Sequence, residues 1–223
     1  MATDPDLWEE RWLSRPRLRK YLRAAGQNRD RALALYLWDA DLAVALLGDI
    51  GHLEVGLRNA YDRALSLLPV LHGRDWLSHD GALAVFPKGL GPDGLRAAMS
   101  RLAIETAAKR AASEHNPPSH DQIITQLTLG FWHNLSADHN ANHLWWPSLA
   151  SAFDDRLDRR AFHGTLGSIR TMRNRCAHHG SVFDHDPVGT HRRVVSAATH
   201  ISPELGQLVR ERSRVPDLMR AKP

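Results

Sequence analysis

Apolar residues recur at intervals of three and four along almost the whole chain, and no long stretch alternates between polar and apolar positions. This spacing is typical of amphipathic α-helices. The longest pattern runs from Asp30 to Leu68, with Gly48 as a candidate bend. Shorter helices are expected over residues 15–25, 95–113, 119–135, 144–153, 158–179 and 190–212, the last with a bend at Ser202-Pro203. The sequence therefore predicts an all-α protein.

Local signals mark where several of these helices begin and end. Gly26 ends the first helix, and Asn28 can cap the start of the next one. Ser119 and Gln122 have the spacing of a capping box. Gly180 is a natural stop for the helix that precedes it.

One segment departs from the helical pattern. Residues 69–94 are rich in Gly and Pro and keep no sustained period, so we expect a long irregular surface insertion there. Hydrophobic residues make up 43% of the 223 residues and charged residues 24%, which is ordinary globular composition. We expect a single helical domain over residues 1–223, with its core at about 28–201 and the 69–94 loop inserted.

Charge and cysteine content indicate the kind of partner and the cellular compartment. The formal net charge is +4, carried mostly by Arg, and suits a polyanionic partner. A single cysteine, Cys176, allows no intrachain disulfide and favours a reducing compartment. Met1 to Trp12 lacks the apolar region of a signal peptide, and no apolar run approaches the roughly 20 residues of a membrane span. We therefore expect a cytoplasmic protein with no membrane partner.

The clearest candidates for catalytic side chains lie in one run, Arg173-Asn174-Arg175-Cys176-Ala177-His178-His179. Arg can hold a phosphate through two parallel N–H donors, and His can give and take protons near neutral pH. Together they could cleave RNA without a metal. A His would take the proton from the ribose 2′-OH, which attacks the neighbouring phosphorus, and Arg173 would stabilise the developing charge. DNA lacks the 2′-OH and should resist cleavage.

The helix geometry poses a question for this chemistry. On an ideal helix Arg170, Asn174 and His178 line one stripe, whereas Arg173 lies about 140° from His178. The Arg side chain could curl back, the helix could be distorted after Ala177, or two copies of the helix could share the site across a dimer. We favour the shared site, because a twofold axis would bring two Arg and two His to one phosphate.

Two other interpretations use the same residues. Arg and His near a helix C-terminus also complement the helix dipole, so the motif alone is a weak signal. The 14 histidines also raise a metal-dependent His-Asp phosphohydrolase as an alternative. Its candidate ligands are His178, His179, Asp184, His185, Asp186 and the pairs His79-Asp80 and His120-Asp121. These pairs fall in predicted loops or at helix starts, so we expect neither a metal nor another cofactor.

Three segments together carry a family resemblance. Arg173 to His179 resembles the signature of the HEPN superfamily, in particular the Abi-like (abortive infection) proteins of bacteria. Leu35-Tyr36-Leu37-Trp38-Asp39 and the following Leu53 to Asn59 resemble the N-terminal helix of that family. Leu129-Gly130-Phe131-Trp132 resembles its central Gly-Phe-Trp segment. The resemblance spans about Leu33 to Phe183 and leaves the 69–94 segment and the Arg-rich C-terminal tail unmatched.

The resemblance implies an up-and-down helical bundle, a homodimer that pairs two motifs, and metal-independent endoribonuclease activity. Arg173 and His178 would be catalytic, with Asn174 as an associated polar residue. The expected role is that of a toxin or phage-defence effector, held in check by an antitoxin or a regulatory RNA. Some members of the superfamily are binding modules, so a non-catalytic bundle that binds RNA or protein is the alternative.

Further residues are assigned supporting roles. Glu54 and Arg58 match the Glu-x-x-x-Arg pattern of the family, and Glu54 could orient the motif Arg or His. At a spacing of i, i+4 the two could equally form a surface ion pair. His179 is expected to support the motif. Arg170 and Arg175 are candidates for contacts to the RNA substrate.

Overall fold

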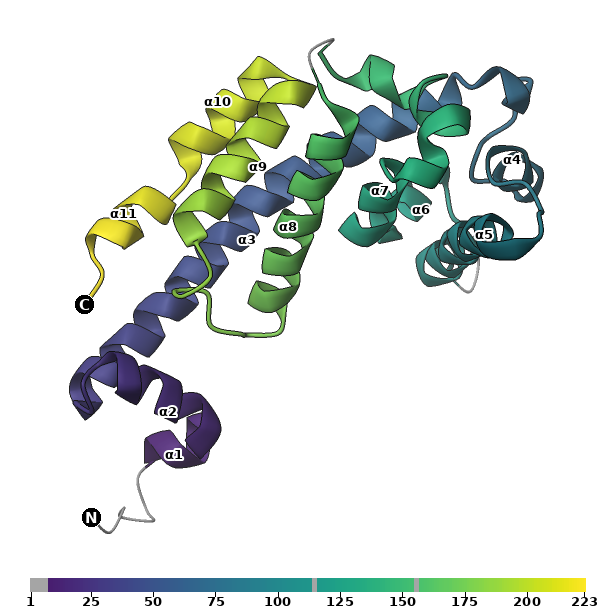
Figure 1. Ribbon diagram of the computed structural model, residues 1–223. Coiled ribbons are helices and arrows are strands. Elements are labelled where there is room, and N and C mark those ends of the chain that lie inside the picture. The colour runs from purple at the N-terminus through teal and green to yellow at the C-terminus, as the bar shows by residue number, and fades with distance from the viewer. Residues whose placement is uncertain (1–7, 114–115, 155–156) are drawn as a thin grey trace.

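The computed structural model describes residues 8–113, 116–154 and 157–223, and within these ranges all regular secondary structure is helical (Figure 1). The all-α prediction is confirmed. The longer helices are α3 (Arg29–Ser66), α5 (Gly91–Ala111), α8 (Arg159–Ala177) and α9 (Pro187–Ile201). The shorter ones are α1 (Trp8–Leu13), α2 (Arg15–Ala24), α4 (His79–Val85), α6 (His120–Gln126), α7 (Leu129–Leu135), α10 (Pro203–Arg212) and α11 (Val215–Arg220).

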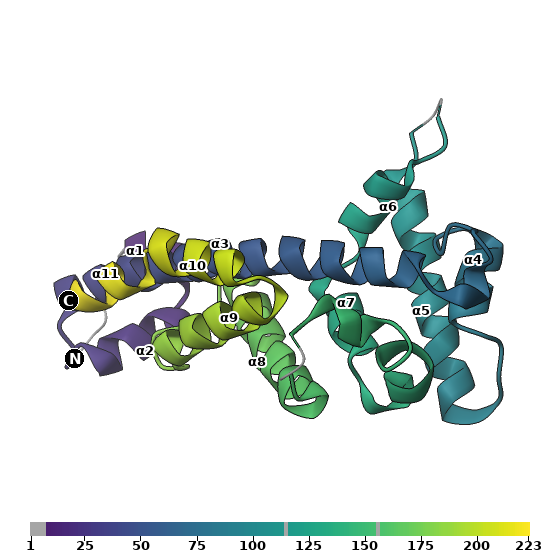
Figure 2. The ribbon, with the colours of Figure 1, turned by 90° about the horizontal axis from the view of Figure 1, so that it is seen from above.

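Helix α3 runs through the whole molecule and organises the other elements around it (Figure 1). Helices α8 and α9 pack along its middle, and α10 packs beside α9. Helices α1 and α2 lie at its N-terminal end, and α4 to α7 gather around its C-terminal end, as the view from above also shows (Figure 2).

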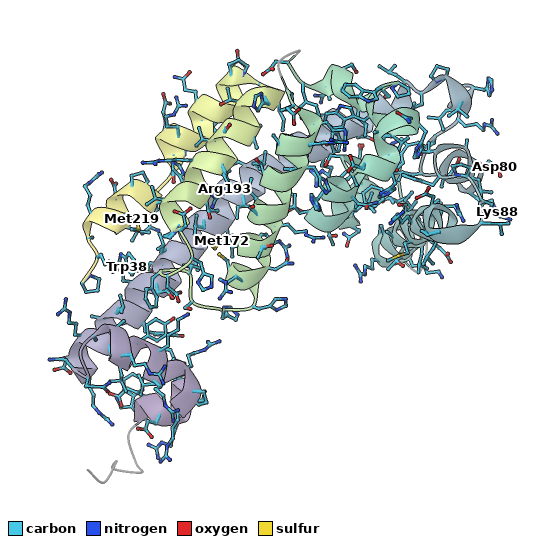
Figure 3. The ribbon with its side chains drawn as sticks, viewed as in Figure 1. Trp38, Asp80, Lys88, Met172, Arg193 and Met219 are labelled. Atoms are coloured by element: carbon cyan, nitrogen blue, oxygen red, sulfur yellow. The ribbon has the colours of Figure 1, made fainter. Side chains whose placement is uncertain are left out.

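Two clusters of buried hydrophobic residues lie along α3. The larger one joins the C-terminal half of α3 to helices α4 to α10. The smaller one joins the N-terminal half of α3, through residues such as Leu42 and Leu46, to Met172 and Cys176 of α8 and to Val182. Trp38 and Met172, both labelled in Figure 3, belong to this smaller cluster. The motif end of α8 is thus packed against the N-terminal half of α3.

Gly48 does not interrupt α3, which is one continuous helix of 38 residues. A glycine within a helix costs only about 1 kcal/mol, which the packing of the neighbouring buried residues outweighs. Asn28 caps the helix as expected, and its side chain accepts a hydrogen bond from the Arg31 N–H at 2.9 Å.

The prediction of an irregular insertion over residues 69–94 is wrong in part. The segment contains the turn Pro69–Leu71, helix α4 and the first residues of α5. It also buries Leu71, Trp76 and Phe86 in the larger cluster. A helix of seven residues is too short to show a sustained period, so the apolar anchors were not recognised.

Other boundaries also differ from the expected ones. The expected helix over 119–135 is two helices, α6 and α7, although the capping box at Ser119 and Gln122 is present. In place of the helix expected over 144–153, the structure has two short helical turns, Ala141–Trp145 and Leu149–Ala152. At Ser202-Pro203 the chain starts a separate helix rather than bending, and α1 and α11 were not expected.

None of the described helices combines the length and the apolar character that a membrane crossing requires. The first seven residues, part of the stretch used to exclude a signal peptide, lie outside the described residues.

Candidate functional site

The motif lies where α8 ends. The helix stops at Ala177, and His178 takes φ −94° and ψ 16°. His179 then adopts a left-handed φ of 55°. The Gly180 N–H donates to the Arg175 carbonyl at 2.8 Å, and a Cβ on Gly180 would lie 2.9 Å from Arg175 Cγ. The helix therefore ends two residues before the predicted boundary, and Gly180 is needed for the tight turn that follows.

The three residues with the expected chemical roles face solvent. Arg173 is partly exposed, while Asn174 and His178 are exposed. None of their side chains makes a hydrogen bond or ion pair with another residue that the structure describes. The His178 N–H still donates to the Asn174 carbonyl at 3.0 Å, so the chain leaves the helical path only after His178. No described contact joins His178 to Arg173. Within one chain, these three side chains therefore have no partner among the residues that the structure describes.

A buried carboxylate holds the loop that follows the motif. Asp39 of α3 is only 3% exposed. Its carboxylate accepts hydrogen bonds from the N–H groups of Val182 at 3.1 Å and Phe183 at 2.8 Å. It also accepts one from the Tyr21 hydroxyl at 2.7 Å. Asp39 thereby ties α2, α3 and the loop together directly behind the motif.

Burial changes the protonation equilibria in this region. Burial raises the pKa of Asp39 above its usual range, although the hydrogen bonds from Tyr21, Val182 and Phe183 oppose the shift. Burial and the nearby Asp39 raise the pKa of the Cys176 thiol to about 11. Cys176 is therefore a protonated packing residue near neutral pH, which disfavours a nucleophilic role.

The sequence pattern did not assign Asp39 a role, although the residue falls within the segment that resembles the family. A usable signal was present: Asp39 directly follows Trp38 on the apolar face of a helix. A polar residue in such a position requires buried partners. The partners come from far along the chain, so the sequence alone could not name them.

An ion pair holds the outer side of the same loop. Lys20 Nζ lies 2.8 Å from a carboxylate oxygen of Asp184 and also hydrogen bonds to the Ser181 hydroxyl. His185 Nδ1 contacts Asp184 at 2.8 Å. Partial burial raises the pKa of Asp184, but the bonds from Lys20 and His185 outweigh it, so the net shift is downward.

A small cavity of about 220 Å³ adjoins the motif. Its walls include Tyr36, Ala40 and Val44 of α3 on one side, and Ala177 and His179 on the side of the motif. His179, predicted to support the motif, therefore faces α3 across this cavity.

The two arginines expected to bind substrate are placed differently. Arg175 Nη1 donates to the Ser181 carbonyl at 3.3 Å, so one of its donors holds the loop. Arg170 is exposed and extends over α7, where a Cβ on Gly130 would lie 3.8 Å from its Nη1.

His133 of α7 lies close to Arg170. Burial, followed by the charges of the neighbouring His163 and Arg170, lowers the pKa of His133 to about 4.

Glu54 and Arg58 lie further along α3. Leu47 is the last α3 residue in the wall of the cavity, and Glu54 is about 10 Å beyond it along the axis. No described hydrogen bond or ion pair joins Glu54 to Arg58, and Arg58 Nε donates to Asn59 Oδ1 at 3.3 Å. The structure therefore shows neither the surface ion pair nor a contact of Glu54 with the motif in the same chain.

The His-Asp alternative requires histidine and carboxylate side chains that together form a metal centre. Across residues 8–113, 116–154 and 157–223, no group of three or more His, Cys, Asp or Glu side chains is placed to hold a metal ion. His120 uses both ring nitrogens in contacts with Asp62 at 2.7 Å and Asp75 at 2.9 Å. The geometry does not support the His-Asp alternative.

Fold and site together define an all-α protein that presents an Arg-x4-His pair at a helix end anchored to a long central helix. The chain belongs to the Abi-like protein family, whose model matches residues 10–184. The match includes the 69–94 segment and ends before α9. No curated protein and no solved structure gives a significant match to the chain.

Proposed function

We propose that this protein is a metal-independent endoribonuclease of the HEPN type that cleaves RNA by attack of the ribose 2′-OH. One observation carries the proposal. At the end of α8, Arg173 is partly exposed, Asn174 and His178 are exposed, and none of the three side chains has a partner among the described residues, while a buried network fixes the loop behind them. Membership of the Abi-like family supports a role in abortive infection.

The chemistry follows from the side chains. One His takes the proton from the 2′-OH as the oxygen attacks the adjacent phosphorus, and a proton is returned to the leaving 5′-oxygen. Arg173 stabilises the charge that develops on the phosphoryl oxygens. The products carry a 2′,3′-cyclic phosphate and a 5′-hydroxyl.

An exposed face of α3 supports a homodimer with a composite site. Leu37, Val44 and Val55 are 50%, 62% and 47% exposed and are spaced by seven and eleven residues, so they share one helical stripe. Nothing lies within 4 Å of a Cβ built on Gly48, which falls on the same stripe. Val44 also lines the cavity beside His179. A second copy bound on this stripe covers the exposed apolar residues and brings two motifs close together.

The decisive test compares wild type, His178→Ala and His79→Ala with structured and unstructured RNA in excess EDTA. His79 is an exposed histidine at the start of α4 and is the matched control. We expect cleavage by wild type and His79→Ala, with 2′,3′-cyclic phosphate ends, and a loss of at least about 100-fold in His178→Ala.

Each other outcome has a definite meaning. If no variant cuts any RNA, the chain acts as the non-catalytic binding bundle instead. If cleavage appears only when a divalent metal is restored, the transesterification mechanism is wrong. Equal cleavage by wild type and His178→Ala would remove His178 from the site.

The homodimer has its own test. Val44→Asp places a charge in the middle of the exposed α3 stripe, and we expect it to convert a dimer to a monomer and to abolish cleavage. Leu208→Asp makes the same change at a 43% exposed position on α10 and should leave both properties unchanged. Light scattering after size exclusion measures the mass. A wild-type monomer that cleaves RNA would refute the shared site.

A toxin or phage-defence effector of this kind needs restraint in the uninfected cell. We propose an antitoxin or a regulatory RNA as the partner that supplies it. Growth arrest on expression of wild type, and its absence with His178→Ala, is the expected result.

A further inference from the structure

Helices α9 and α10 form an antiparallel hairpin whose groove contains a second cavity. Its volume is about 440 Å³. Most of its polar lining residues come from the two helices, namely Arg192, Ser196, Thr199 and His200 of α9 and Arg210 of α10. No motif residue lines it, and the hairpin lies outside residues 10–184, the region that the family model matches.

The groove forms because the two helices approach each other closely. A Cβ on Gly206 would lie only 2.0 Å from Thr199 Oγ1, so α10 rests directly on α9 at this point. On α10, Arg210 lies one helical turn after Gly206. On the antiparallel helix α9, Ser196 lies nearly one turn before Thr199. Arg192 lies one further turn along the same face as Ser196. The hairpin thus directs two guanidinium groups into one cavity from different helices.

The two arginines of this cavity have no acidic partner among the described residues. Arg192 and Arg210 are exposed and form no ion pair with any residue in the described ranges. The one acidic lining residue, Asp154, already contacts His200 Nδ1 at 2.8 Å. His191, which also lines the cavity, is turned to Asp49 of α3, with 2.8 Å between Nδ1 and Oδ2.

Hydrogen-bond donors remain available beside the two arginines. The Ser196 hydroxyl makes no hydrogen bond with a described residue. Asp154 contacts His200 at Nδ1, and no described residue hydrogen bonds to its Nε2. The Thr199 hydroxyl already donates to the Val195 carbonyl at 2.8 Å, so it adds no donor.

These donors suit a phosphoryl group. One Arg fork satisfies both oxygens of a carboxylate, whereas two forks, a hydroxyl and an imidazole call for a ligand with more acceptor oxygens and more charge. A cavity of about 440 Å³ also has room for more than an isolated anion and falls in the range of small-molecule sites.

We propose that the α9–α10 cavity binds a phosphoryl group of a nucleotide, contacted by Arg192 and Arg210 with Ser196 and His200. The nucleotide is either free or part of an RNA strand. The site does not depend on RNA cleavage, and binding can be measured when the motif is inactive.

The experiment measures binding of two probes by calorimetry at low salt, without divalent metal. One probe is ATP. The other is an eight-residue RNA that is fully 2′-O-methylated, so that it cannot be cleaved, and carries no terminal phosphate. The test variant is Arg192→Gln/Arg210→Gln. The control, Arg212→Gln/Arg214→Gln, removes the same charge at exposed positions outside the cavity. Arg173→Gln reports on the motif.

We expect saturable binding of at least one probe, weakened by at least about tenfold in Arg192→Gln/Arg210→Gln and by less than about twofold in the control. Binding of ATP alone identifies a free nucleotide as the ligand, and binding of the RNA identifies the strand. For the RNA, loss of two phosphate contacts should also reduce the slope of log affinity against log salt by about 1.4.

Three results would overturn the proposal. The first is no saturable binding of either probe below about 1 mM. The second is an equal loss in the control variant, which would indicate only general charge attraction. The third is loss of binding in Arg173→Gln with full binding in Arg192→Gln/Arg210→Gln, which would place the phosphate at the motif.

Discussion

Replacement of Asp39 by alanine tests whether one buried carboxylate positions the motif loop. In the native protein the carboxylate accepts hydrogen bonds from the Tyr21 hydroxyl at 2.7 Å, from Phe183 N–H at 2.8 Å and from Val182 N–H at 3.1 Å. Asp39→Ala leaves these three donors without their acceptor. Tyr21 is 3% exposed and Val182 is 0% exposed, so water cannot easily replace the lost bonds.

The expected loss of stability follows from two opposing effects. A buried donor without a partner costs about 1–3 kcal/mol, and three donors are affected. Removal of the carboxylate also removes its own desolvation cost, which the raised pKa of Asp39 reflects. We therefore expect a net loss of about 2–4 kcal/mol, or about 5–15 °C in the melting temperature for a chain of this size.

The assay is thermal and urea unfolding of Asp39→Ala beside Asp41→Ala. Asp41 is exposed on the same helix and has no described partner, so its replacement should change stability by less than about 0.5 kcal/mol. Tyr21→Phe removes one of the three hydrogen bonds and should cost about 1 kcal/mol. At a temperature where Asp39→Ala is still folded, RNA cleavage should fall because the loop behind the motif is released. Equal stability of the Asp39 and Asp41 variants would refute the reasoning.

Three further predictions concern pH and packing. The pKa of His133 is lowered to about 4 in the folded protein. As the pH falls below about 6.5, this histidine is therefore protonated in the unfolded chain before it is protonated in the folded one. The free energy of unfolding is fully retained above about pH 6.5 and decreases toward about pH 4. Since His133 is only partly buried, we expect a loss of about 1–2 kcal/mol, and His133→Gln should flatten the dependence of melting temperature on pH. Gly206→Ala should destabilise the protein by at least about 1–3 kcal/mol, because its Cβ would lie 2.0 Å from Thr199 Oγ1. Gly48→Ala meets nothing within 4 Å and should stabilise α3 by about 0.5–1 kcal/mol, as thermal melts of the two variants would show.

Long amphipathic patterns predicted the fold class correctly, whereas the same periodicity argument missed the short helices. Helix α3 was expected nearly residue for residue because its apolar positions repeat over many turns. Helix α4 was taken as loop because seven residues include too few apolar positions to define a period. The break between α6 and α7 was missed for a related reason, since Leu127 and Thr128 do not interrupt the apolar spacing across it.

The candidate site shows a similar division between local and distant information. The Arg-x4-His run and its helix are local features, so the sequence located them. The contacts of Asp39 with Val182 and Phe183 join residues more than 140 positions apart, and no local pattern encodes them. The cavity between α9 and α10 depends on the close approach at Gly206, which becomes visible only when the two helices are placed.

The distribution of contacts around the motif favours a site completed from outside the chain. Arg175 and Asp39 form hydrogen bonds with the loop that follows the motif, and these bonds fix the end of α8. Arg173, which is partly exposed, and His178, which is exposed, form no side-chain hydrogen bond with described residues, although acidic side chains could have paired with them. A rigid support beneath unpaired polar groups is the arrangement expected of groups reserved for a ligand or for a second copy. Because Arg173 and His178 do not meet within one chain, the second copy is the simplest source of the missing partner, and loss of cleavage together with loss of the dimer in Val44→Asp is the result that this reasoning requires.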